Sequence, residues 1–140
     1  NELASVPGLQ PLREQLLESA LQFYADLTER DGGNEFSLET ARAFQRIAAI
    51  RRELEQSDAA RQANTQSIAL FEKIRTVKPN DQAVLLGLAT TLLQAGRPVE
   101  VVQLCQQIIE FDDKNPTALE LLAALAQGER TRAAQRFRRS

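Results

Sequence analysis

The amino-acid sequence predicts an all-α protein, an α-α superhelix of about six helices arranged in antiparallel pairs. Three observations predict this fold class. The chain is rich in Ala, Leu, Gln, Glu and Arg, and such residues lose little conformational freedom in a helix. Its β-branched residues never alternate with polar residues over the length of a strand. Apolar residues instead recur at helical spacing between short breaks of Gly, Pro, Asn and Asp.

The first predicted helix covers about residues 11–30. Pro11 suits an opening turn, and Gly32 and Gly33 allow the left-handed backbone that closes a helix. Its apolar residues recur at steps of three or four, which places them on one face. They are Leu12, Leu16, Ala20, Phe23 and Leu27, with Leu17, Leu21 and Tyr24 beside them.

The second and third helices form the first complete pair. The second starts near Ser37, a good N-cap, and runs through LETARAFQRIAAIRREL. Its apolar seam contains Leu38, Ala41, Phe44, Ile47 and Ala48. The third begins around Ser57 or Asp58, another capping pair, and ends before Pro79. Its inner face contains Ala60, Ala63, Ser67, Ile68, Phe71 and Ile74.

The remaining three helices are separated by clear breaks. Asp81 caps the fourth helix, residues 82–95, and Gly96 ends it. Pro98 opens the fifth helix, residues 98–111, in keeping with Gly after a helix end and Pro at a helix start. Asn115 and Pro116 form the cap and first position of the sixth helix. This helix passes through TALELLAALAQ and is expected to fray into the arginine-rich end.

Residue types exclude several kinds of site. The 140 residues include no His and a single Cys, so a Ser-His-Asp triad, a Cys-His pair and a His-ligated zinc site are not available. Cys105 lies among apolar residues and is interpreted as a buried, inert thiol. Asp112 and Asp113, near Glu110, are typical of a helix-ending turn and lack EF-hand spacing. We therefore expect no catalytic residue, no metal, no cofactor and no enzyme activity.

Charge and hydropathy limit the partners. A formal net charge of −2 argues against a nucleic-acid surface over the whole domain. The basic end is interpreted as a solvated terminal helix, with contact to nucleic acid or an anionic membrane as the alternative. It contains Arg130, Arg132, Arg136, Arg138 and Arg139. No run reaches the roughly 18 apolar residues of a membrane span, so no membrane insertion is expected.

Two helices carry a repeated pattern. Leu85-x2-Leu88-Ala89-x2-Leu92 recurs as Leu119-x2-Leu122-Ala123-x2-Ala126. A weaker copy, Phe44-x2-Ile47-Ala48-x2-Arg51, precedes Ala60 by sixteen positions, as Leu85 precedes Val101. The small residues Ala48, Ala89 and Ala123 are expected to let the paired helix approach closely. Over about residues 37–127, this pattern and the step from Leu85 to Leu119 resemble the tetratricopeptide repeat family, whose period is about 34 residues.

The resemblance implies one helical repeat domain over residues 1–140. Residues 1–36 are expected to form an N-terminal cap or half repeat, 37–78 an elongated first repeat, 79–114 a second and 115–140 a partial third. The step from Phe44 to Leu85 is seven residues longer than the period. The seven extra residues are about two helical turns, which keep the same face of a longer third helix turned inward. Residues 12–34 and 38–54 also resemble the repeat regions of bacterial eukaryote-like serine/threonine kinases, although no kinase motif is present.

The resemblance also implies a ligand groove along the first helix of each pair. Nine positions are the leading candidates for partner binding: Arg42, Gln45, Arg46, Ala49, Arg52, Leu86, Thr90, Leu93 and Glu120. The same mapping adds Ala83, Thr117, Leu121 and Ala124. A basic end and an apolar middle would suit an amphipathic or acidic peptide. The alternative is that Leu86 and Leu93 pack under a neighbouring helix and that the arginines are solvated.

The resulting functional expectation is a non-catalytic module that binds a protein or peptide on its concave face, within a larger signalling protein. The alternative is a structural or dimerisation domain with no free ligand, so a homo-oligomer stays open. The chain does not begin with Met, and we expect it to be a segment of a longer protein. The expected location is the cytoplasm, with tethering to a membrane-anchored parent protein as the alternative.

Overall fold

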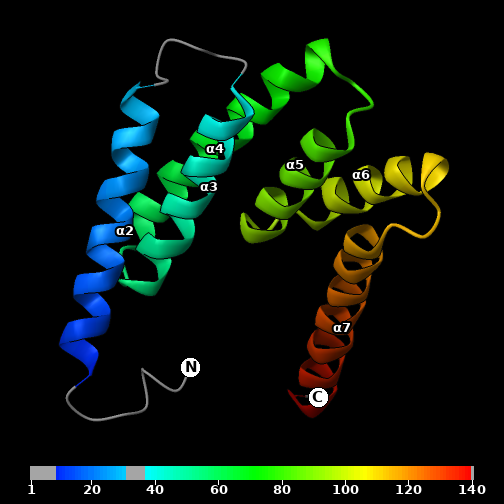
Figure 1. Cartoon of the computed structure of the whole chain (residues 1–140). Coiled ribbons are helices and arrows are strands. Elements are labelled where there is room, and N and C mark those ends of the chain that lie inside the picture. Colours follow the sequence, from blue (N-terminus) through cyan, green and yellow to red (C-terminus); the bar gives the residue numbers. More distant parts are fainter. Residues whose placement is uncertain (1–8, 31–36, 140) are drawn as a thin grey trace.

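The computed structural model describes residues 9–30 and 37–139, and this part of the chain is helical apart from short turns. The helices are α2 (Gln10–Arg30), α3 (Leu38–Glu53), α4 (Ser57–Val77), α5 (Gln82–Gln94), α6 (Pro98–Phe111) and α7 (Pro116–Arg139). The predicted all-α fold class is confirmed (Figure 1). The predicted stop at Gly32 and Gly33 lies outside the described residues.

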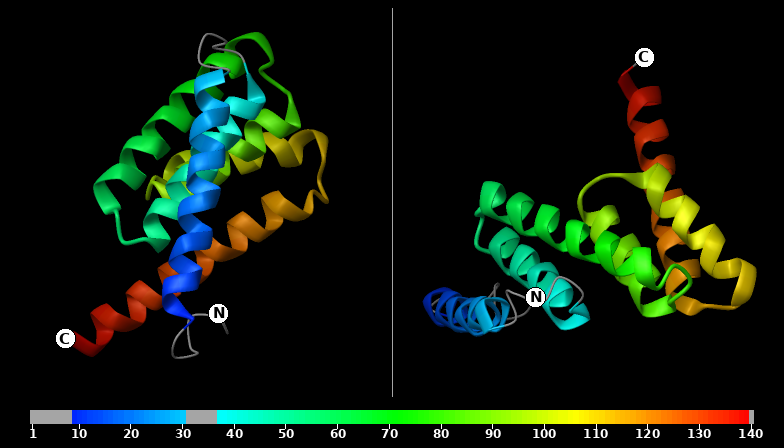
Figure 2. Two further views of the ribbon diagram at one scale, coloured as in Figure 1. Left: turned by 60° about the vertical axis from the view of Figure 1, so that its left-hand side comes forward. Right: turned by 90° about the horizontal axis from the view of Figure 1, so that it is seen from above.

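The helices form a curved row, in which each one turns back along the helix before it (Figures 1 and 2). Every helix packs on its neighbour in sequence. Among the described helices, the backbones of α3 and α5 and those of α5 and α7 also approach each other, whereas the backbones of the end helices α2 and α7 do not. The row is therefore an open stack of antiparallel helices and not a bundle closed around one axis.

Several helix ends follow the predicted capping chemistry. The side chains of Ser37 and Asp81 accept hydrogen bonds from the backbone N–H groups of Thr40 and Val84, at 3.1 and 3.2 Å. Asn115 Oδ1 accepts from the backbone N–H of Ala118 at 3.0 Å. Gly96 adopts the left-handed φ of 75° that ends α5. These side chains satisfy backbone donors that a helix start leaves unpaired.

The predicted cap of α4 is wrong. Gln56 occupies the N-cap position and makes no side-chain capping bond, while Ser57 is already helical. The Asp58 carboxylate accepts a hydrogen bond from the Arg61 guanidinium, and Gln56 Oε1 accepts from Arg51 Nη1 at 2.7 Å. These side chains are therefore engaged elsewhere, and the chain turns through Glu55, whose φ is 62°.

The main core forms where α5 packs between α4 and α6. The α5 side chains Leu85, Leu88, Ala89 and Leu92 are each at most 1 % exposed. They pack with residues of the neighbouring helices, among them Phe71, Ile74, Val101, Leu104, Cys105 and Ile108. A smaller cluster joins α2, α3 and α4 through Leu21, Ile47, Ala48 and Ala63. Burial of this aliphatic surface is the main stabilising term of the stack.

The close approach predicted at three alanines holds at two of them. Ala48 and Ala89 are fully buried, whereas Ala123 is exposed. The prediction for Ala123 is wrong because α7 packs on α6 and α5, and no described helix covers its other side. Nor does α7 fray after Gln127, since its helix continues to Arg139.

The apolar face predicted for the first helix is not the face that packs. Leu21 is the buried residue of α2, while Leu12, Leu16 and Phe23 are 48 %, 57 % and 56 % exposed. The helix is rotated so that its Leu21 side lies against α3, and this rotation leaves an apolar stripe on the outside of the stack.

Candidate functional site

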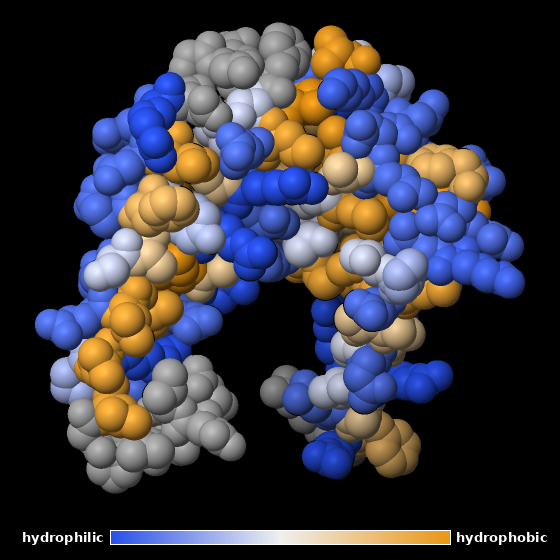
Figure 3. Space-filling view, viewed as in Figure 1, coloured by the Kyte–Doolittle hydropathy of each residue, from blue (hydrophilic) through white to orange (hydrophobic). Residues whose placement is uncertain are grey.

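A groove of about 520 Å³ follows the inner side of the curve. The backbone of α5 approaches those of α3 and α7, whereas the backbones of α4 and α6 stay apart, and this places α3, α5 and α7 on the inside. The groove is lined by Arg42, Gln45, Gln82, Ala83, Leu86, Gly87, Thr90 and Thr117. Figure 3 shows the opening between the arms formed by α2 and α7, with hydrophilic side chains at its upper margin.

Four of the nine leading candidates meet in this groove: Arg42, Gln45, Leu86 and Thr90. Ala83 and Thr117, from the wider mapping, line it as well. The other candidates lie elsewhere: Arg46, Arg52 and Glu120 are exposed outside the lining, Ala49 is half-buried, and Leu93 packs against the core. Leu121 is part of the core cluster, and Ala124 is exposed.

Gln45 has a structural role at the base of the groove. Its Nε2 donates to Thr91 Oγ1 at 3.0 Å and to the Gly87 carbonyl oxygen at 3.4 Å. Thr91 Oγ1 itself donates to the Gly87 carbonyl at 2.8 Å. This small network ties α3 to α5, and it fixes the spacing of the two helices that form most of the groove.

The basic edge of the groove is formed by α3. Arg42 and Arg46 are one helical turn apart and exposed, and neither is paired with another residue in the described part of the chain. Arg52, further along the same helix, donates to Gln94 Oε1 at 3.2 Å. Two unpaired guanidinium groups close together attract an anionic group more strongly than one that is already hydrogen-bonded.

The apolar middle of the groove is only partly available. Leu86 and Leu93 are half-buried and pack against the main core, as the alternative interpretation of these residues expects. Leu86 also lines the groove, so one side of it faces the core and the other faces the opening. Leu93 lies outside the lining and packs against the main core.

Two lining residues were missed by the sequence reasoning. Gln82 lies one turn before Leu86 and two before Thr90, so the same helical spacing extended by one step points to it. Its Nε2 donates to Asp112 Oδ2 at 2.9 Å. No sequence spacing points to Gly87. The need for a glycine at this position comes from the Phe71 ring of α4, which lies against it in the folded chain.

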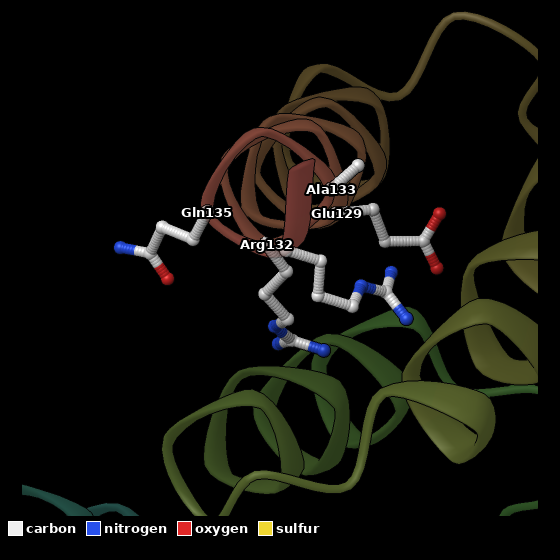
Figure 4. Close-up of a pocket in the computed structure, with 5 residues that line it drawn as sticks. Glu129, Arg132, Ala133 and Gln135 are labelled. Atoms are coloured by element: carbon white, nitrogen blue, oxygen red, sulfur yellow. The ribbon is translucent and has the colours of Figure 1, made fainter. Parts of the chain in front are cut away.

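A second depression, of about 620 Å³, lies along the far half of α7. It is lined by Glu129, Arg132, Ala133, Gln135 and Arg136, all from this one helix (Figure 4). These side chains are exposed, and no other described helix contributes to the lining. It is therefore open helix surface and does not have the convergent walls of a binding site.

The described residues contain no group of three or more Cys, Asp and Glu side chains placed to hold a metal ion. Burial raises the pKa of the Cys105 thiol, and the side chain is fully buried in α6. A thiol in this setting stays protonated and unreactive. In the described part of the chain, no helix is both long enough and apolar enough to cross a membrane.

The open stack of helix pairs with a groove on its inner side defines an α-solenoid. Residues 58–125, a little under half of the chain, match the family model described as Tetratricopeptide repeat. This match agrees with the tetratricopeptide repeat pattern that the sequence predicts for this segment. No curated protein and no solved structure matches the chain. Tetratricopeptide repeats generally mediate protein–protein interactions and are typically non-catalytic.

Proposed function

We propose that this protein is a non-catalytic module that binds an acidic or amphipathic peptide segment, or a neighbouring domain, along α3, α5 and α7. The observation that carries the proposal is the groove itself, since three helices that are not adjacent in sequence supply its lining. We further propose that the module acts within a larger signalling protein, in the cytoplasm or tethered to a membrane-anchored parent.

The chemistry of the lining supports an extended anionic ligand. Arg42 lines the groove and Arg46 lies one helical turn away on α3, and both guanidinium groups are exposed and open to a carboxylate. Gln82 and the threonines Thr90 and Thr117 place polar side chains along the groove, within reach of a peptide backbone. The outer side of Leu86 supplies apolar surface for an aliphatic side chain. Such a mixture of charged steering and apolar contact is typical of peptide grooves.

Charge reversal at the basic edge tests this proposal. The probe is a fluorescent peptide rich in Glu and Leu, compared with a counterpart that carries Lys in place of Glu, and anisotropy reports binding. We expect the acidic peptide to bind and the basic one not to. The double variant Arg42→Glu/Arg46→Glu should weaken acidic-peptide binding by about tenfold, since each partly exposed pair contributes about 0.5–1 kcal/mol.

The matched control is Arg130→Glu/Arg132→Glu, which makes the same charge change on α7, away from the groove. It should leave binding within about twofold of the wild type. Both pairs of arginines are exposed, so neither variant removes a buried group. Equal binding of the two peptides, or equal losses in the two variants, would show that the groove does not select by charge at this edge.

A further inference from the structure

The helix α7 presents a pairing surface that no other described helix covers. The equivalent surface of α5 is buried in the main core between α4 and α6 and is formed by Leu85, Leu88, Ala89 and Leu92, each at most 1 % exposed. The corresponding positions of the next repeat, in α7, are Leu119, Leu122, Ala123 and Ala126. Leu119 is 47 % exposed, and Ala123 and Ala126 are exposed as well, whereas Leu122 is half-buried and packs against the main core. We call the three exposed residues of α7, Leu119, Ala123 and Ala126, the tail face.

The opposite end of the stack carries a complementary surface. Leu12, Leu16 and Phe23 form a stripe on α2 at steps of four and seven residues, and all three are about half exposed. Leu21, which packs on α3, belongs to another side of the helix. Hydrophobic atoms follow the length of α2 in Figure 3. We call these three residues of α2 the head face.

The head and tail faces of one molecule cannot meet, because α2 and α7 lie at opposite ends of the row and do not touch (Figure 1). The direction of the helices favours a meeting between molecules. The row contains six described helices that alternate in direction. In a second molecule with the same orientation, α2 therefore runs antiparallel to α7 of the first, as α6 runs to α5.

The charges of the two end helices are also complementary. The α2 sequence contains four acidic and two basic residues, a net charge of −2. The α7 sequence contains two acidic and five basic residues, a net charge of +3. Opposite net charge favours contact between α2 and α7 and disfavours contact of either helix with its own copy.

We propose that the tail face of one molecule binds the head face of a second copy, so that copies stack head to tail and α7 and α2 complete a helix pair between them. The interface is heterologous, and it leaves a free head and a free tail on every assembly. A single pair of helices buries about 1,000 Å² or less, which is the size of a weak contact. The assembly therefore grows with concentration and dissociates on dilution.

Sedimentation of the whole chain from micromolar to near-millimolar concentration tests the proposal. The mean mass of the wild type should rise with concentration and pass the mass of a dimer. The variants are Leu16→Glu on the head face and Leu119→Glu on the tail face. Each substitution disrupts one of the two faces. Each variant alone should therefore be mainly monomeric, with a dissociation constant for self-association at least about tenfold higher than that of the wild type.

The equimolar mixture of the two variants is the decisive measurement. Leu16→Glu keeps an intact tail and Leu119→Glu keeps an intact head, so the mixture should form one-to-one dimers and nothing larger. Ala123→Arg adds bulk at an exposed methyl and should behave as Leu119→Glu does. Val99→Glu, at a 69 % exposed position of α6 outside both faces, should associate like the wild type. Circular dichroism checks that each variant keeps its helices.

Three results would overturn the proposal. A wild-type chain that stays monomeric at the highest concentration shows that the two faces do not bind each other. Loss of association in only one of the two face variants points to a symmetric contact of one face with itself. Association that survives in both variants places the contact elsewhere on the molecule.

Discussion

Gly87 lies in the middle of α5, where a glycine normally weakens a helix, and its replacement by Ala gives a prediction whose sign can be worked out. A Cβ atom at Gly87 would lie 2.5 Å from both Cε1 and Cζ of Phe71 and 3.3 Å from Cε2. Carbon atoms in contact are normally about 3.5–4.0 Å apart. The Phe71 ring is fully buried in the main core, so a shift of the ring away from the new Cβ displaces its neighbours in the core.

The magnitude follows from two opposing effects. Replacing Gly by Ala in a helix interior contributes about 1 kcal/mol of stability. Overpacking of a filled core costs about 1–3 kcal/mol, and a clash with two ring atoms belongs at the upper end of that range. We expect Gly87→Ala to lower the free energy of unfolding by about 2 kcal/mol, which is a fall of about 8 °C in Tm for a chain of this size.

The assay is thermal and denaturant unfolding followed by circular dichroism, with Gly128→Ala as the matched control. Gly128 is also helical, and a Cβ there would meet nothing within 4 Å, so its replacement should leave Tm equal or higher. In a Phe71→Leu background, Gly87→Ala should become neutral or stabilising because the ring atoms are gone. A Gly87→Ala variant at least as stable as the wild type would refute the reasoning.

Two further predictions concern buried polar groups. Asn64 Oδ1 is buried and has no hydrogen-bond partner among the described residues. The substitution Asn64→Leu should therefore raise the free energy of unfolding by about 1 kcal/mol. A lower Tm in thermal unfolding, or a lower midpoint in urea, would contradict this. Because burial raises the pKa of Cys105, the unfolded chain loses the thiol proton at lower pH than the native chain does, and stability should fall as pH rises through the ordinary thiol pKa. That decline should be smaller in Cys105→Ala, and the native thiol should react with a disulfide reagent only as fast as the protein unfolds.

Local chemistry made much of the fold predictable. Gly96 followed by Pro98 marks a helix end and a helix start on either side of a tight turn, and both signals depend on backbone preferences of single residues. The burial of Ala89 was predictable for a different reason, since the spacing of its large neighbours recurs in the next repeat. Such signals lie within one helix or one repeat, so a sequence shows them directly.

The features that escaped the sequence depend on contacts between distant residues. Ala123 has the same local pattern as Ala89, and its exposure depends on whether a helix covers α7. Gln45 has the polar character of a ligand-binding residue, yet its amide is used to join α3 to α5. The stripe of Leu12, Leu16 and Phe23 is apolar at the right spacing, but the rotation of α2 about its axis is set by packing at Leu21.

Contact mainly between close neighbours makes the curvature of the row mechanically soft. A small rotation between each helix and the next adds up along the row and changes its overall curvature, while few contacts between any two helices change. If a ligand binds among α3, α5 and α7 as proposed, small shifts at each junction between helices would change the curvature of the whole row. Stretching the row from its two end helices would in turn change the spacing of the three helices that line the groove.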